Sequence, residues 1–160
     1  MEVLSQSYTL TVFFYNPNIH PEDEYEKRLK DVVTLCKLMD TELLVPEYRP
    51  DIWLEQTRGM GSAAEGGDRC AVCFDLRFQK TAAVAVTRGF GTFASTLTVS
   101  PHKNAGVINR IGQTVAAGHG ISFLAADFKK RNGFKRSCTL SREYEFYRQK
   151  YCGCLYSMGA

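Results

Sequence analysis

The sequence predicts an α/β fold in which helices are layered against a mostly parallel sheet. Short apolar runs alternate with segments whose apolar residues recur at helical spacing, which is the pattern of βαβ units. The chain has 160 residues, of which 44% are hydrophobic and 23% charged, the composition of an ordinary globular protein. No internal repeat or low-complexity linker divides it. We therefore expect a single domain over residues 1–160.

The first part of the chain predicts two strands and two helices. Residues 10–15 form an apolar run that ends at an Asn-Pro-Asn turn. A helix begins at Pro21, carries three acidic residues in its first turn and places Cys36 on its core side. Residues 42–45 are the second expected strand, and residues 51–58 form a short helix.

The remainder of the chain continues this alternation. Asp68 is a typical helix N-cap residue, and proline after serine is typical of a helix start. The expected segments are, in order, a glycine-rich mobile loop over residues 59–67, a helix from its cap at Asp68 to Arg88, a strand over residues 92–97, a helix opened by Ser100-Pro101, a strand over residues 121–124 and a helix that begins after Ser141 and ends at Cys152.

Charge and hydropathy exclude some classes of protein. The 20 Lys and Arg residues against 17 Asp and Glu give a formal net charge of +3, too small to indicate nucleic-acid binding by itself. The longest apolar runs are far shorter than the roughly 20 residues of a membrane-spanning helix. Residues 1–7 contain no signal-peptide pattern. We expect a soluble cytoplasmic protein without a membrane partner.

Four of the six cysteines form two close pairs, Cys70 with Cys73 and Cys152 with Cys154. Thiols three residues apart share a helix face, and a helix N-terminus favours thiolates. The glycine between Cys152 and Cys154 allows a bend that turns both sulfurs toward one ion. Four thiolates suit zinc or a 4Fe-4S cluster. Spacing alone leaves open an iron-sulfur centre, a structural zinc, a thiol-redox pair and chance burial.

Two further groups of residues could contact a substrate. Tyr144, Tyr147, Arg148 and Tyr151 recur at helical steps, as core residues or as the lining of a pocket beside Cys152. Cations lie in the expected loop around Asn132-Gly133 and at the expected helix start after Ser100-Pro101. They would either bind the phosphates of a nucleic acid or simply be solvated. These cations are Lys103, Lys129, Lys130, Arg131, Lys135 and Arg136.

Five blocks, in order along the chain, resemble the QueH-type epoxyqueuosine reductases. The most specific features are an Arg-Cys-x-x-Cys string and a closing Tyr-Arg-Gln-x-Tyr-Cys-Gly-Cys string. The blocks cover residues 12–19, 24–29, 69–77, 96–104 and 147–157. The resemblance implies an oxidoreductase that reduces epoxyqueuosine to queuosine at the tRNA wobble position, the last step of queuosine biosynthesis. It also implies a nucleotide-hydrolase-like (HUP, Rossmann-like) fold.

The resemblance further implies an iron-sulfur metalloenzyme that needs no cobalamin. Its cofactors would be a 4Fe-4S cluster and a neighbouring iron ion, with zinc as the alternative, bound by Cys70, Cys73, Cys152 and Cys154. Its partners would be tRNA carrying epoxyqueuosine, bound by the six cations named above, and an external electron donor. Tyr147 or a metal-bound water would donate a proton to the reaction.

This sequence departs from the family pattern at its beginning. Family members open with a strand and a Cys-Cys-x-x-Cys segment, whereas this chain begins in what resembles the tail of the next helix. We therefore expect an N-terminally truncated domain that lacks the first strand. It is either the product of an internal start, which the intact later motifs favour, or a shortened protein with an incomplete metal centre. The remaining functional alternatives are a zinc-stabilised tRNA-binding module without catalysis and a thiol-redox protein.

Overall fold

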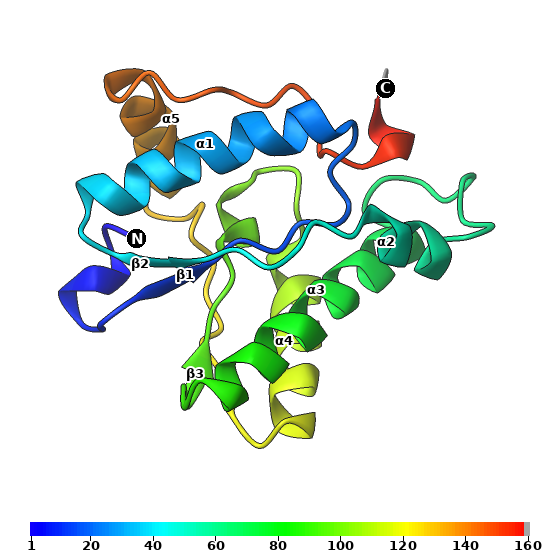
Figure 1. The fold of residues 1–160 in the computed structure, drawn as a ribbon, viewed down its shortest axis with the longest axis horizontal. Coiled ribbons are helices and arrows are strands. Elements are labelled where there is room, and N and C mark those ends of the chain that lie inside the picture. Colours follow the sequence, from blue (N-terminus) through cyan, green and yellow to red (C-terminus); the bar gives the residue numbers. More distant parts are fainter. Residues whose placement is uncertain (159–160) are drawn as a thin grey trace. The chain divides into compact units, whose positions relative to one another are not determined.

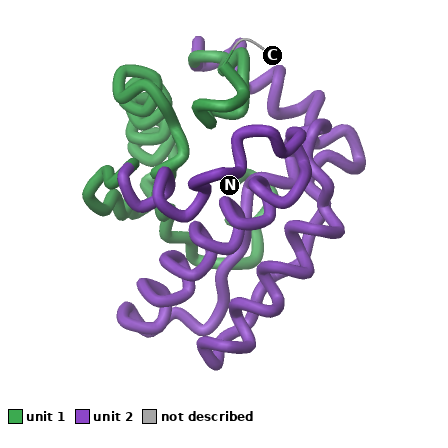
Figure 2. The backbone as a smooth tube through the Cα atoms, turned by 90° about the vertical axis from the view of Figure 1, so that its right-hand side faces the viewer, with its two compact units in different colours: residues 1–50, 147–160 green, residues 51–146 purple. Residues whose placement is uncertain are grey.

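The computed structural model describes residues 1–158, which form two compact units (Figure 2). Unit 1 combines residues 1–50 with the C-terminal residues from Tyr147 onward, and unit 2 spans Asp51–Phe146. The expectation of a single domain over the whole chain stays a prediction. No helix in the described part of the chain has the length and apolar character needed to cross a membrane.

Unit 1 is built around two short parallel strands (Figure 1). Strand β1 (Thr11–Phe13) pairs with β2 (Glu42–Leu44), and helix α1 (Glu22–Leu38) connects them, as βαβ geometry requires. The 3-10 turns η1 (Leu4–Gln6) and η3 (Leu155–Ser157) lie near the two ends of the chain. The predicted first strand, the first helix and the second strand are therefore confirmed.

The core of unit 1 forms where α1 covers the residues that follow β1. Phe14, Ile19 and Tyr25 are buried there. The ring of Tyr25 stacks on that of Tyr48 at 4.2 Å and lies tilted against Phe14 at 5.3 Å. Cys36 is 3% exposed, which confirms its expected position on the core side of α1.

Unit 2 contains a second parallel pair, β3 (Thr92–Phe93) with β4 (Ser122–Phe123). Two long helices pack on each other and contact this pair, α3 (Asp68–Thr87) and α4 (Ala105–Gly118). The remaining elements are α2 (Pro50–Gln56), which leads into the unit, the 3-10 turn η2 (Thr96–Val99) and α5 (Gly133–Glu143). Helices that alternate with parallel strands in both units confirm the α/β class.

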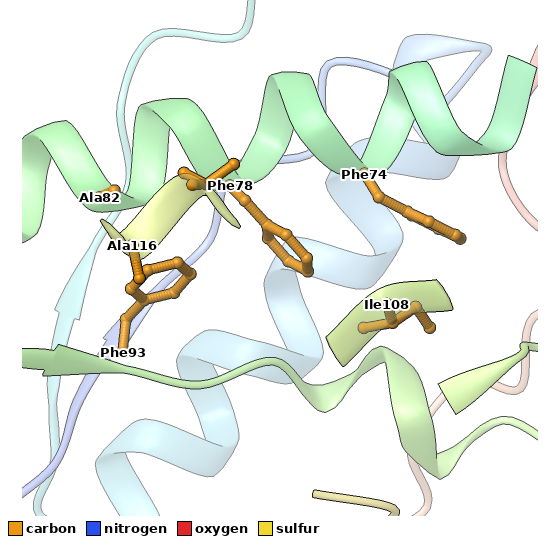
Figure 3. Packing of buried hydrophobic residues seen from close by; sticks show 7 residues of the cluster. Phe74, Phe78, Ala82, Phe93, Ile108 and Ala116 are labelled. Atoms are coloured by element: carbon orange, nitrogen blue, oxygen red, sulfur yellow. The ribbon is translucent and has the colours of Figure 1, made fainter. Parts of the chain in front are cut away.

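The core of unit 2 lies between α3, α4 and the β3–β4 pair (Figure 3). Its buried members are Phe74, Phe78, Ala82, Phe93, Ile108, Val115 and Ala116. The rings of Phe78, Phe93 and Phe123 contact one another, with centroids 5.1–5.9 Å apart. Gly112 permits this packing, because a Cβ atom there would lie 2.5 Å from the ring of Phe123. The core residues of α3 and α4 follow the apolar periodicity that predicts the two helices.

Two helix starts differ from expectation. Gly67 is the N-cap of α3 and Asp68 is its first residue, so the Asp68 carboxylate interacts with the helix dipole instead of capping the helix. Helix α4 does not open at Ser100-Pro101. It begins after Asn104, whose side chain accepts a 3.2 Å hydrogen bond from the Val107 amide and thereby caps it.

The predicted strand over residues 92–97 is also too long. Strand β3 ends at Phe93, and Thr96 and Leu97 belong to η2. The Ser95 hydroxyl accepts a 3.2 Å hydrogen bond from the Leu97 amide, which turns the chain away from the extended conformation.

The position predicted for the last helix differs from the observed one. Helix α5 spans Gly133–Glu143, and residues 144–154 have no helix. The helix ends where Glu145 adopts a left-handed backbone conformation, with φ of +54°. The expected helix from Ser141 to Cys152 is therefore wrong.

Candidate functional site

The first cysteine pair lies at the start of α3 in unit 2. Cys70 is in the first turn of the helix and half-buried, and Cys73 follows one turn later at 7% exposure. Their three-residue spacing on a helix places both on one face. The Gly66 amide donates a 3.2 Å hydrogen bond to the Cys70 sulfur. Such bonds to sulfur are one means by which proteins tune metal-thiolate centres.

The glycine-rich loop before this pair is tied down by Arg69, which is 4% exposed. Its Nη1 donates to three loop carbonyl oxygens, those of Met60 at 2.8 Å, Gly61 at 3.1 Å and Ala63 at 2.6 Å. Glu65 in the same loop pairs with the Nζ of Lys103 at 2.7 Å. The loop is therefore anchored at two points, whereas composition alone predicts a mobile segment.

The second cysteine pair lies in unit 1, in the irregular segment that runs beside α1 (Figure 1). Cys152 is half-buried and Cys154 is 8% exposed. Gly153 between them has φ of +103°, and a Cβ atom there would lie 2.9 Å from Ile19. The bend expected at this glycine is confirmed. That both sulfurs face one ion stays a prediction.

Residues of α1 and the turn before it bond to this segment. Arg28 donates from Nη2 to the Tyr151 carbonyl and from Nη1 to the Cys152 carbonyl, each at 3.1 Å. Its partner on the helix is Glu24, whose carboxylate lies 2.7 Å from Nη2. The His20 amide donates to the Gly153 carbonyl at 2.8 Å. Sequence reasoning missed Glu24 and Arg28; their i,i+4 spacing is the one signal that could have found them.

Tyr147 also contacts α1. Its hydroxyl donates to Glu24 Oε2 at 2.9 Å and its amide donates to Asp31 at 2.7 Å, while the side chain remains 40% exposed. The hydrogen bond to the Glu24 carboxylate, followed by partial burial, raises the pKa of Tyr147 above 10.0. The hydroxyl therefore retains its proton at neutral pH.

The expected helical stripe of Tyr144, Tyr147, Arg148 and Tyr151 does not exist. Tyr144 is the C-cap residue of α5 in unit 2, and the other three belong to the irregular segment of unit 1. Tyr151 contacts the start of α1 instead, through a hydrogen bond from its hydroxyl to the His20 carbonyl. The regular spacing of these residues is thus unrelated to a helix.

The predicted cations fall into two groups. Lys130, Arg131, Lys135 and Arg136 are exposed, and we call them the basic cluster. Lys135 and Arg136 lie in the first turn of α5, whereas the sequence predicts a loop.

Lys103 and Lys129 instead take part in contacts inside unit 2. Lys103 is 9% exposed and pairs with Glu65. The Nζ of Lys129 donates to the Lys103 carbonyl at 2.9 Å and lies 3.3 Å from Asp127. Their binding to tRNA stays a prediction.

The thiols present suit a soft metal centre. Among residues 1–158, no three His, Cys, Asp or Glu side chains are grouped as a metal site. Each unit supplies one close pair of cysteines, and thiolates are the ligands that iron-sulfur clusters and zinc prefer. That the two pairs bind one centre stays a prediction.

Comparison with known proteins finds one family. The family model described as epoxyqueuosine reductase QueH matches residues 1–160. Three curated proteins of that name are similar: those of Streptococcus pyogenes serotype M1 (44% identity, 98% of this chain, 64% of the relative), Staphylococcus epidermidis (34%, 98% and 69%) and Acinetobacter baylyi (38%, 92% and 68%). The chain thus spans about two thirds of the length of these relatives.

Proposed function

Because this chain belongs to the epoxyqueuosine reductase QueH family, we propose that it reduces epoxyqueuosine to queuosine in tRNA with an iron-sulfur centre. The observation that carries the proposal is the family match over residues 1–160, a range that contains both cysteine pairs. Removing the epoxide oxygen as water takes two electrons and two protons. An external donor of electrons is therefore part of the proposal.

Cys70, Cys73, Cys152 and Cys154 would hold a 4Fe-4S cluster with a neighbouring iron ion. Their thiols are the right donor type. Hydrogen bonds from Arg69 brace the loop that precedes the first pair, and those from Arg28 brace the backbone beside the second pair. When bound, such a centre supplies electrons one at a time and a Lewis acid that polarises a carbon-oxygen bond.

Tyr147 is proposed as the proton donor. Its hydroxyl is protonated at neutral pH, and the hydrogen bond that the Glu24 carboxylate accepts raises its pKa further. The side chain is exposed enough to meet a substrate. Its exposure and its protonation state are what support this role.

The basic cluster is proposed to bind tRNA phosphates. Its four cations are exposed and lie within seven consecutive residues, 130–136. Lysine and arginine side chains that neutralise phosphates supply most of the sequence-independent affinity for nucleic acid. A tRNA substrate also implies that the protein works in the cytoplasm.

The proposal is tested by purifying the chain without oxygen and loading it with ferrous iron and sulfide. We expect a brown protein that dithionite bleaches and that converts epoxyqueuosine in tRNA to queuosine, measured by mass spectrometry of the digested tRNA. The same preparation without iron is the control.

The alternatives have different signatures in the same experiment. A colourless, zinc-loaded protein that binds tRNA without converting it would support a zinc-stabilised binding module. A metal-free protein with a reactive thiolate at Cys70 or Cys73 would support a thiol-redox protein. Either result would contradict the proposed reductase.

A further inference from the structure

We propose that Arg28 is a positioning residue that fixes the backbone of Cys152-Gly153-Cys154 so that the two thiols can bind the metal centre. This inference rests on the proposed function and deepens it. Arg28 lies on α1, more than 120 residues before the cysteines. It acts through main-chain bonds beside them and need not touch the substrate.

Three consecutive carbonyl groups around the cysteine pair accept hydrogen bonds from the α1 region. Arg28 donates to those of Tyr151 and Cys152, and the His20 amide donates to that of Gly153. The segment has no helix or strand of its own, so its backbone groups need partners from elsewhere. Fixing the peptide groups on both sides of Cys152 and after Gly153 limits where the two thiols can point.

Arg28 is itself held in place. Its side chain is 11% exposed and that of Glu24 is 7% exposed. Glu24 Oε1 lies 2.9 Å from Nε and 2.7 Å from Nη2, and the guanidinium lies 5.4 Å from the centre of the Tyr151 ring. The other carboxylate oxygen of Glu24 accepts the Tyr147 hydroxyl. One buried ion pair therefore links the cysteine turn to the proposed proton donor.

The shape of the guanidinium matters more here than its charge. The Glu24 carboxylate, 2.7 Å from Nη2, offsets the positive charge of the guanidinium. A planar guanidinium can donate to one carboxylate and two carbonyl groups at fixed angles, whereas a lysine ammonium is a point charge that cannot reproduce this arrangement. The variant Arg28→Lys therefore keeps the positive charge and removes the arrangement of donors, which distinguishes the two effects.

The experiment compares the full wild-type chain with Arg28→Lys, Arg28→Gln and a control, Lys27→Gln. Lys27 is the neighbouring cation on α1, with a side chain that is 56% exposed. Each protein is loaded with iron and sulfide without oxygen. Bound iron, the electron paramagnetic resonance spectrum of the reduced protein and the rate of iron loss to a ferrous chelator are then measured. Circular dichroism and thermal unfolding check the fold.

We expect both Arg28 variants to lose iron at least about tenfold faster than wild type and to give an altered resonance spectrum, as changes beside metal ligands commonly do. Lys27→Gln should match wild type. If the Arg28 variants do not fold, Glu24→Gln, which retains Arg28 and the size of residue 24, tests the same claim. It should also speed iron loss, and an unchanged rate would contradict the inference.

The outcomes separate the inference from the proposed function. If wild type binds iron and Arg28→Lys keeps the wild-type rate of iron loss and the wild-type spectrum, the positioning role is wrong and the proposed function stands. If Arg28→Gln is impaired and Arg28→Lys is not, charge and not position is responsible, and the inference again fails. Wild type that takes up no iron overturns the proposed function, and the inference with it.

Discussion

Two arginines have the same role at the residue scale. Arg69 donates to carbonyl groups of the loop before Cys70, and Arg28 donates to carbonyl groups beside Cys152. Irregular backbone lacks the regular hydrogen bonds of a helix or sheet, and an arginine with several donors can bond to two or three of its carbonyl groups at once. This explains how the loop before α3 is fixed and how a segment without helix or strand can hold Cys152 and Cys154 in a defined position.

His20 predicts a pH dependence of stability. Burial lowers the pKa of His20 below 6.5, so the unfolded chain binds its proton more readily than the folded protein does. Keeping His20 neutral therefore adds to the stability of the folded protein. This stabilisation is fully present above about pH 6.5 and is lost as the pH falls through the lower pKa of His20 in the folded state. We expect a smaller free energy of unfolding at about pH 5.5 than at about pH 7.5, measured by urea unfolding.

The matched variant for this prediction is His20→Gln. It retains the main-chain amide and carbonyl through which residue 20 contacts Gly153 and Tyr151. Its unfolding free energy should change less between the two pH values. An equal change in both proteins would show that His20 is not the group responsible.

The basic cluster belongs to the scale of elements, because it combines the turn before α5 with the first turn of that helix. Lys130→Glu with Arg131→Glu should weaken tRNA binding and make it less dependent on salt. Two lost phosphate contacts reduce the slope of log affinity against log salt by roughly 1.5. Lys129 is omitted, because its contacts with Lys103 and Asp127 support the fold. Lys130 is kept, because its side chain is 77% exposed and its Nζ lies as far as 4.0 Å from Asp127.

The control for this prediction is Lys80→Glu, a charge reversal at an exposed position of α3. It should leave the salt slope near the wild-type value. Titration by fluorescence anisotropy at several salt concentrations measures both effects. A slope that the double variant does not change would remove the basic cluster from the tRNA interface.

Elements with strong apolar periodicity are predictable from this sequence, and those set by single side-chain bonds are not. Helices α1 and α3 follow from repeating apolar positions that become cores. The 3-10 turn η2 depends on the Ser95 hydroxyl, and the start of α4 on the Asn104 side chain. The spacing of Tyr144, Tyr147 and Tyr151 predicts a helix, but α5 has already ended before them, at Glu143, and the backbone of Glu145 is left-handed.

Some features of the candidate site are likewise predictable from the sequence, and others are not. The cysteine pairs are visible as motifs, and the bend at Gly153 follows from the properties of glycine. The contacts of Arg28 with the cysteine segment are not predictable, because its carbonyl partners lie 123 and 124 residues away in the chain. Only the folded unit brings them together.

On the scale of the whole molecule, the proposed centre takes its ligands from both compact units. Cys70 and Cys73 belong to unit 2, and Cys152 and Cys154 belong to unit 1. Metal bound by these thiolates would stabilise the folded chain against unfolding, because metal binding is coupled to folding. The central claim of the proposed function is therefore that each pair is necessary for the same cluster.

That claim is tested most directly by the iron and sulfide content of three anaerobically loaded proteins. These are wild type, Cys70→Ser with Cys73→Ser, and Cys152→Ser with Cys154→Ser. If the two pairs share one centre, wild type binds the cluster and each double variant loses it along with its resonance spectrum. A double variant that retains a complete cluster with the wild-type spectrum would show that one pair is dispensable and would contradict the account.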